Sequence, residues 1–305
     1  MVRFSLRQLE LLAELPRHST LGSAASELNI SESALSQAIT AVERIAGEQL
    51  CVRRKSLGVR MTPAGQYFAA RAARIVADAE ELGDSFPRSD GTLRGPVSMG
   101  CFSSFASHVV PSMLEGFRAV QPGIDVKVSV GTHDDLLPAL ESGELDFALV
   151  YDLLLPSGFT KRTIYETQLE VVLHPGHRLA AKESISLAEL EAEPLVDYES
   201  SPSTENTRRL FAEADLSPNI AYTLPQVTLV NAMIGRGLGY GLLYSRPNNP
   251  PHTLEGLPVA LRELEPPNSP TSVVAIWPRS STLGPRALTL VEHGIQTMAG
   301  AWNQG

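Results

Sequence analysis

Two helical patterns meet across a very short break early in the chain, and this pair limits the possible folds most. In the first pattern, Leu21, Ala24, Ala25 and Leu28 follow the i, i+3, i+4, i+7 spacing of one helix face. Ser31 is a good N-cap for a second helix. The helical period then resumes at Ala34, Leu35, Ala38, Ile39 and Val42. Because two alanines allow a close crossing, the stretch predicts a helix-turn-helix, a motif whose second helix enters the major groove of DNA.

The period alone fits an αα-hairpin inside an ordinary helical domain equally well. The side chains between the core positions favour DNA, because most are short or planar hydrogen-bonding groups where a merely solvated helix more often carries Lys, Glu and Arg. We therefore predict a DNA-binding set of Ser31, Ser33, Ser36, Gln37 and Thr40, with Arg53, Arg54 and Lys55 contacting phosphate.

Three local motifs in this region resemble the LysR-type transcriptional regulators. They are Ala24-Ala25-x-x-Leu28-x-x-Ser31-x-x-Ala34-Leu35-Ser36-x-x-Ile39, then Gly47-x-x-Leu50-x-x-Arg53, then Val59-Arg60-Met61-Thr62-Pro63-Ala64-Gly65. The resemblance covers residues 5–65 with almost no gaps, and less specifically nearly the whole chain. Two positions depart from the family pattern. Cys51 stands where the family usually has Phe, and Gln37 stands where Arg is frequent, so the base preference does not carry over.

The charge balance of the 305-residue chain changes along its length. The whole chain has a net charge of −9, but residues 1–65 hold eight Lys and Arg against six Asp and Glu. That head is therefore +2 and the remainder −11, which is consistent with DNA binding at one end only. No apolar run is long enough to span a membrane and no signal peptide is visible, so we expect a cytoplasmic protein with no membrane partner.

A long helix is predicted to follow the head, with Thr62 as its cap and Pro63 at its first position. Apolar residues recur along it with alternating spacings of four and three, which is an a/d seam. The seam consists of Phe68, Ala72, Ile75, Ala79, Leu82 and Phe86. A single amphipathic helix packed on its own domain is the alternative. The regular spacing favours a partner helix, and in the resembling family this helix makes the dimer.

Beyond a hinge-like stretch at 87–96, strands and helices alternate as βαβαβ, which predicts a parallel sheet. We expect a winged helix-turn-helix domain at 1–65, a linker helix at 66–88 and an effector-binding domain at 89–305. The last has two α/β lobes, at about 92–162 plus 270–300 and at 163–269. The class is thus α+β and α/β, and two lobes joined by two crossings resemble the periplasmic-binding-protein fold, which binds a small effector between its lobes.

Hydroxyl and aromatic groups follow several predicted strands at their carboxyl ends, where open α/β sheets bind ligands. The predicted effector-binding residues are Ser103, Ser104, Thr132, Tyr151, Ser203 and Val227; for five of these, the matching positions in related regulators line the cleft, Ser103 being the exception. Each hydroxyl alone is better explained as a helix cap, but their convergence on one edge of the sheets favours a binding site. Some relatives that bind aromatic acids have Arg at the position of Tyr151, so its loss weakens the case for a carboxylate effector, although His133 and the helix N-termini could still bind one.

The remaining motifs argue for a regulator rather than an enzyme or a secreted binding protein. No GxSxG, HExxH, P-loop or CxxC occurs, no metal site is predicted, and 235–241 fails the GxGxxG pattern and is interpreted as a helix-to-strand turn. Cys51 and Cys101 are expected to be inert thiols, with a redox switch as the alternative. We expect no cofactor besides an unidentified effector. The expected partners are double-stranded operator DNA, a second copy in a dimer and then a homotetramer, and RNA polymerase.

Overall fold

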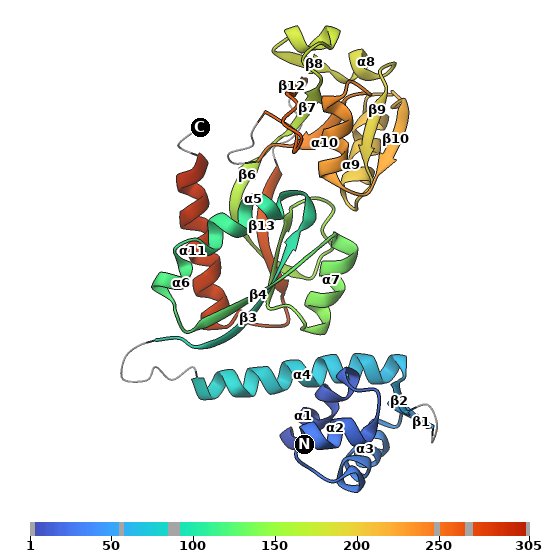
Figure 1. Cartoon of the computed structure of the whole chain (residues 1–305), viewed down its shortest axis with the longest axis vertical. Coiled ribbons are helices and arrows are strands. Elements are labelled where there is room, and N and C mark those ends of the chain that lie inside the picture. Colours follow the sequence, from blue (N-terminus) through green and yellow to red (C-terminus); the bar gives the residue numbers. More distant parts are fainter. Residues whose placement is uncertain (1–3, 55–57, 85–91, 247–250, 266–270, 303–305) are drawn as a thin grey trace. The chain divides into compact units, whose positions relative to one another are not determined.

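The computed structural model describes the chain in two units, a head with its following helix and a larger C-terminal domain (Figure 1). The described residues are 4–54, 58–84, 92–246, 251–265 and 271–302. Among them, no helix is both long enough and apolar enough to cross a membrane.

The head contains the predicted helix-turn-helix followed by a two-stranded wing. Its elements are α1 (Leu6–Glu14), the 3-10 helix η1 (Leu15–Arg17), α2 (Leu21–Glu27), α3 (Glu32–Ala46), β1 (Cys51–Arg54) and β2 (Gly58–Met61). Ser31 caps α3 by accepting a hydrogen bond from the Ala34 amide at 3.1 Å. Gly47 ends α3 in the left-handed conformation, with φ of 73°. The predicted N-cap of this helix is therefore confirmed.

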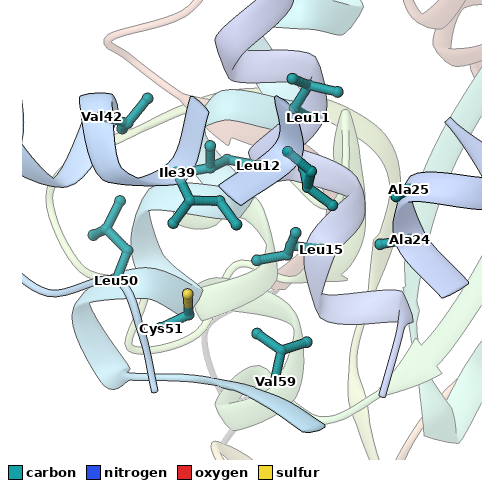
Figure 2. Packing of buried hydrophobic residues seen from close by; sticks show 11 residues of the cluster. Leu11, Leu12, Leu15, Ala24, Ala25, Ile39, Val42, Leu50, Cys51 and Val59 are labelled. Atoms are coloured by element: carbon teal, nitrogen blue, oxygen red, sulfur yellow. The ribbon is translucent and has the colours of Figure 1, made fainter. Parts of the chain in front are cut away.

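The helix-turn-helix and the wing share one hydrophobic core (Figure 2). Its buried members are Leu11, Leu12, Leu15, Ala24, Ala25, Leu35, Ile39, Val42, Leu50, Cys51 and Val59. The Cys51 side chain is only 1% exposed, so this smaller residue still fills the wing base. Because the core joins residues from every element of the head, the angle between α2 and α3 is fixed by packing rather than by the turn alone.

Hydrogen bonds from backbone amides of the wing hold it against the rest of the head. The side chain of Glu43 on α3 accepts hydrogen bonds from the Leu50 and Cys51 amides, at 2.9 and 3.2 Å. At Gly58, which has φ of 76°, a Cβ would lie 2.0 Å from the Ser19 carbonyl oxygen. Only glycine therefore permits the Val59 amide to reach that same oxygen at 2.9 Å.

The linker helix α4 spans Pro63–Asp84. Thr62 caps it, since its Oγ1 accepts from the Gly65 amide at 3.0 Å. The ring of Phe68 packs edge-on against that of Phe4 at 5.3 Å, so the first seam residue is used by the head's own core. Ala72 is also buried, whereas Ile75 is 50% exposed. The side chain of Leu82 and the whole of Phe86 lie outside the described residues.

The first lobe of the C-terminal domain is a five-stranded sheet in the order β4-β3-β5-β13-β6. Strand β3 pairs in parallel with β4 and β5, as the βαβαβ pattern predicts, whereas β13 is antiparallel to β5 and β6. The elements are β3 (Gly95–Phe102), α5 (Ser103–Leu114), α6 (Phe117–Val120), β4 (Ile124–Gly131), α7 (His133–Ser142), β5 (Phe147–Tyr151), β6 (Phe159–Thr167), β13 (Thr271–Pro278) and α11 (Pro285–Trp302). Helix α11 lies against β6 and α5 (Figure 1).

The second lobe joins a four-stranded sheet, β11-β7-β12-β8, to the parallel pair β10-β9 through a bridge between Leu195 and Tyr240. Helix α10 lies over β9 and β7, and α9 flanks β9. The elements are β7 (Leu169–Leu173), the 3-10 helix η2 (Arg178–Ala181), β8 (Ser184–Ser186), α8 (Leu187–Leu190), β9 (Leu195–Tyr198), α9 (Ser203–Glu213), β10 (Ile220–Leu224), α10 (Val227–Gly235), β11 (Gly241–Tyr244) and β12 (Ala260–Glu265).

Three details differ from the sequence-based expectation. Strand β6 was not predicted, and because it pairs with β13 along Phe159–Thr167, the chain leaves the first lobe after Thr167 rather than near Thr163. Strand β8 was also missed. The βαβαβ pattern implies one helix between its first two strands, but the structure has two, α5 and α6, separated at Gly116 with φ of 75°, while Pro111 lies inside α5. The glycine-rich stretch at 235–241 does connect a helix to a strand, as expected.

Candidate DNA interface and candidate effector cleft

The exposed face of α3 carries the predicted base-reading residues. Ser33, Gln37 and Thr40 are exposed and Ser36 is half-buried. The Thr40 hydroxyl donates to the Ser36 carbonyl oxygen at 3.0 Å, so it is partly satisfied within the helix. Gln37 makes no side-chain hydrogen bond to any described residue, which leaves both ends of its amide available. Gln37 is therefore the member of the set best able to make a bidentate contact.

The basic residues of the wing are described less fully. Arg53 and Arg54 lie in β1, which pairs with β2 through Val59 and Gly58. Their side chains and the whole of Lys55 lie outside the described residues. The hydroxyl of Ser31 caps α3 and lies 2.9 Å from the hydroxyl of Ser33, so Ser31 has a structural role whatever it contacts on DNA.

A cleft lies between the two lobes of the C-terminal domain, where several strands end and helices begin. Four of the predicted effector residues, Ser104, Tyr151, Ser203 and Val227, line it. Ser203 and Val227 are the first residues of α9 and α10, and Ser104 is the second of α5. The other lining residues are Leu169, Tyr198, Asn206, Thr207, Leu242, Leu243, Tyr244 and Arg246. The cleft thus combines three helix N-termini with a mostly aromatic and aliphatic wall.

Hydrogen bonds and rings tie the lobes together across this cleft. Ser103 of the first lobe shares a 2.8 Å hydrogen bond with the hydroxyl of Tyr198 in the second. The Arg246 guanidinium donates to the Ser104 carbonyl oxygen at 3.0 Å. The rings of Tyr151 and Tyr244 lie 4.7 Å apart. The cavity left at the centre measures about 10 Å³, about the room of one water molecule. This is a closed form of the cleft.

Tyr151 and Tyr244 of the cleft are neutral phenols. Burial raises the pKa of Tyr151 to about 12, although the nearby Arg246 and a hydrogen bond with Ser104 act in the opposite direction. Burial likewise raises the pKa of Tyr244, whose hydroxyl accepts from the Asn206 amide at 2.9 Å. At neutral pH these groups offer hydrogen bonds without charge, so Arg246 is the one charged side chain among the residues named above as lining the cleft.

Two of the predicted effector residues do not line the cavity. Thr132 is held locally, because its amide and hydroxyl both donate to Asp135, at 2.8 and 2.9 Å. Ser103 contacts the cleft only through Tyr198. His133 is buried against the ring of Phe102, and its Nε2 has no hydrogen-bond partner among the described residues. It does not line the cavity either.

Sequence reasoning missed Arg246, Asn206 and Tyr244. Asn206 lies in α9, and no local signal in the sequence marks it. Arg246 had a signal, since it follows the apolar strand Gly241–Tyr244 by two residues, and the rule of strand carboxyl ends covers it as it covers Tyr151.

The thiols are buried. Cys51 and Cys101 are 1% and 0% exposed, and neither forms a disulfide within the described residues. Burial raises the pKa of the Cys101 thiol, which keeps it protonated and poorly reactive. Within the described residues, no three His, Cys, Asp or Glu side chains come together in a way that could hold a metal ion.

Comparison with known proteins agrees with this architecture. Residues 6–66 match the model of the bacterial regulatory helix-turn-helix protein, lysR family, and residues 90–299 match that of the LysR substrate binding domain. The HTH-type transcriptional regulator MetR of Salmonella typhimurium is 30% identical over 234 residues, which is 75% of this chain and 73% of MetR.

Solved structures show the same fold along nearly the whole chain. HinK, a LysR family transcriptional regulator from Pseudomonas aeruginosa, is 28% identical with a TM-score of 0.63, covering 97% of this chain and 99% of its own. Full-length CbnR in complex with its target DNA is 20% identical with a TM-score of 0.62, covering 96% of this chain and 100% of its own. The chain belongs to the LysR family: it is a DNA-binding transcriptional regulator with an effector-binding domain, and not an enzyme.

Proposed function

We propose that α3 reads operator DNA in the major groove through Ser33, Ser36, Gln37 and Thr40, while Ser31 and the wing residues Arg53, Arg54 and Lys55 contact the backbone. The observation that carries this is the exposed face of α3, where the Gln37 amide has no partner among the described side chains. A buried core holds α3 firmly, which keeps such a contact pre-organised. The DNA complex of CbnR supports a duplex as the partner.

The effector binds between the lobes against Ser104, Tyr151, Ser203 and Val227, with Ser103 and Thr132 acting on the edges of the site. No other cofactor is needed. Because the described cavity holds about one water, the effector binds a more open arrangement of the lobes and shifts the protein toward it. This change in the arrangement of the lobes is transmitted to the DNA-binding heads.

Two heads read two half-sites, so we propose that α4 forms a dimer along Ile75, Ala79, Leu82 and Phe86, with Phe68 and Ala72 supporting the base of the seam. Pairing of the C-terminal domains then gives a homotetramer. The protein acts in the cytoplasm and influences transcription through RNA polymerase.

The test is DNase I footprinting of the DNA upstream of the protein's own gene, beside anisotropy titrations with that DNA and with a random duplex. We expect a protected region and an affinity for specific DNA at least about a thousandfold above that for random DNA. Equal affinity for both duplexes at every salt concentration would rule out sequence-specific reading by this chain.

A further inference from the structure

Arg246 is a buried cation with no counterion among the described residues. Arg246 is 8% exposed and follows β11 in the second lobe. Its one hydrogen bond from the side chain runs to the Ser104 carbonyl oxygen, and no described carboxylate forms an ion pair with it. A guanidinium has five N–H donors, and a buried charge is costly unless it is paired. Most of the hydrogen-bonding capacity of Arg246 is therefore unused in the closed cleft.

The surroundings of Arg246 favour a negative charge. None of the residues lining the cavity is Asp or Glu. Three helices of nine or more residues, α5, α9 and α10, begin at the cavity, and the N-terminus of a helix is its positive end. Burial raises the pKa of Glu170 on β7 to about 6, and the nearby charge of Arg246 acts in the opposite direction. Glu170 does not line the cavity and is too far for an ion pair.

Part of the remaining cleft wall is apolar, beside the polar side chains of Ser104, Tyr198, Ser203, Asn206 and Thr207. Leu169, Leu242, Leu243 and Val227 line this apolar part together with the ring of Tyr151. A ligand with one compact polar end near Arg246 can place an apolar body against these side chains. The planar fork of arginine matches the two oxygens of a carboxylate.

We propose that the effector is a small organic monocarboxylate, aromatic or aliphatic, whose carboxylate binds Arg246. The inference rests on the proposed function, since it names the class of effector for that cleft. It also reverses an expectation from the sequence: Tyr151 replaces an arginine found in some relatives, but Arg246 supplies a guanidinium from the other lobe. Because Arg246 already holds Ser104 across the cleft, an incoming carboxylate competes with that bond between the lobes.

The experiment uses the full-length chain and matched pairs of acids and amides. Melting temperature and calorimetric affinity are measured with benzoate, phenylacetate, cinnamate and hexanoate, each beside its primary amide, at constant ionic strength set with sodium chloride. We expect at least one acid to bind and its amide to bind about ten- to a hundredfold more weakly, the range of a charged hydrogen bond.

Variants then test which residue recognises the carboxylate. Arg246→Gln should abolish the preference for acid over amide, Arg246→Lys should keep part of it, and Arg118→Gln, an exposed arginine of α6, should leave it unchanged. The ratio of acid to amide affinity is the readout, because a variant that only loosens the fold weakens both ligands alike. If Arg246→Gln does not fold, the lysine variant carries the test, since it keeps the charge without the planar fork.

Three outcomes overturn the inference. If no acid binds, or if amides bind as tightly as acids, the effector is not a carboxylate, and in the second case the cleft itself still binds ligands. An acid preference that survives in Arg246→Gln would assign the charge recognition elsewhere. None of these results affects the footprint on operator DNA, so failure of the ligand class is distinguishable from failure of the proposed regulator function.

Discussion

His133 shows what burial does to a single titratable residue. It is 3% exposed at the start of α7, and burial lowers its pKa to about 4, although Asp134 acts in the opposite direction. The unfolded chain binds a proton at this residue near pH 6.5, well above the folded value. Between these two values the unfolded state holds more protons, so stability rises with pH.

We predict that acidification destabilises the domain through His133. The contribution is fully present above about pH 6.5 and is lost as the pH falls toward 4, at about 1.4 kcal/mol per pH unit and about 3 kcal/mol in total. Urea unfolding at several pH values, on the wild type and on His133→Gln, measures it. The variant should lose less stability across this window, and parallel curves for the two proteins would contradict the assignment.

Gln37 carries the second prediction at this scale. Its side chain is exposed on α3 and free of described hydrogen bonds, so truncation should not affect folding. Gln37→Ala should cost about 1–3 kcal/mol on operator DNA and much less on random DNA, because a bidentate base contact is lost. Anisotropy titrations with both duplexes check this. Equal losses on the two would mean that Gln37 contacts backbone rather than bases.

At the scale of elements, the wing depends on one side chain of the recognition helix. Glu43 accepts from the amides of Leu50 and Cys51, both buried residues at the start of β1. Glu43→Ala leaves these two donors without their acceptor, so we predict a loss of about 2–3 kcal/mol in the free energy of unfolding. Glu48→Ala, at an exposed position just beyond α3, is the control. Similar denaturation midpoints for both variants would show that water replaces Glu43 at little cost.

The elements that could be predicted are those with a local signal. Ser31 and Gly47 mark the two ends of α3, and the helical period gives its buried face. Strand β6 lacks such a signal, since its membership in the first lobe is decided by pairing with β13, more than a hundred residues later. Tertiary context of this kind is absent from a local pattern.

The same distinction applies to the candidate cleft, where some lining residues could be predicted from local signals and others could not. Ser104, Tyr151, Ser203 and Val227 line it because strand ends and helix starts are visible in a sequence. Thr132 satisfies the same rule but is held by Asp135, three residues on, and only coordinates reveal that. Arg246 could have been found by applying the rule to β11.

At the scale of the whole molecule, self-association depends on α4. Ile75 is 50% exposed within one chain, so a polar residue there should leave the fold of the single chain intact. Ile75→Glu puts a charge in the seam, and we predict a dimer weakened by several kcal/mol if that charge stays unpaired. Sedimentation velocity and operator affinity measure this, with Ala73→Glu on another face of α4 as the control. An unchanged particle mass for Ile75→Glu would exclude the seam.

The small size of the cavity between the lobes also limits how fast a ligand can bind. The cavity bridged by the Ser103–Tyr198 and Arg246–Ser104 bonds has room for about one water molecule, so a larger ligand fits only when the lobes part. Such opening motions take microseconds to milliseconds or longer. In stopped-flow mixing, the observed rate of binding should therefore rise with ligand concentration and then level off at the opening rate. The speed at which this regulator answers its signal would be set by the protein's own opening, however abundant the effector becomes.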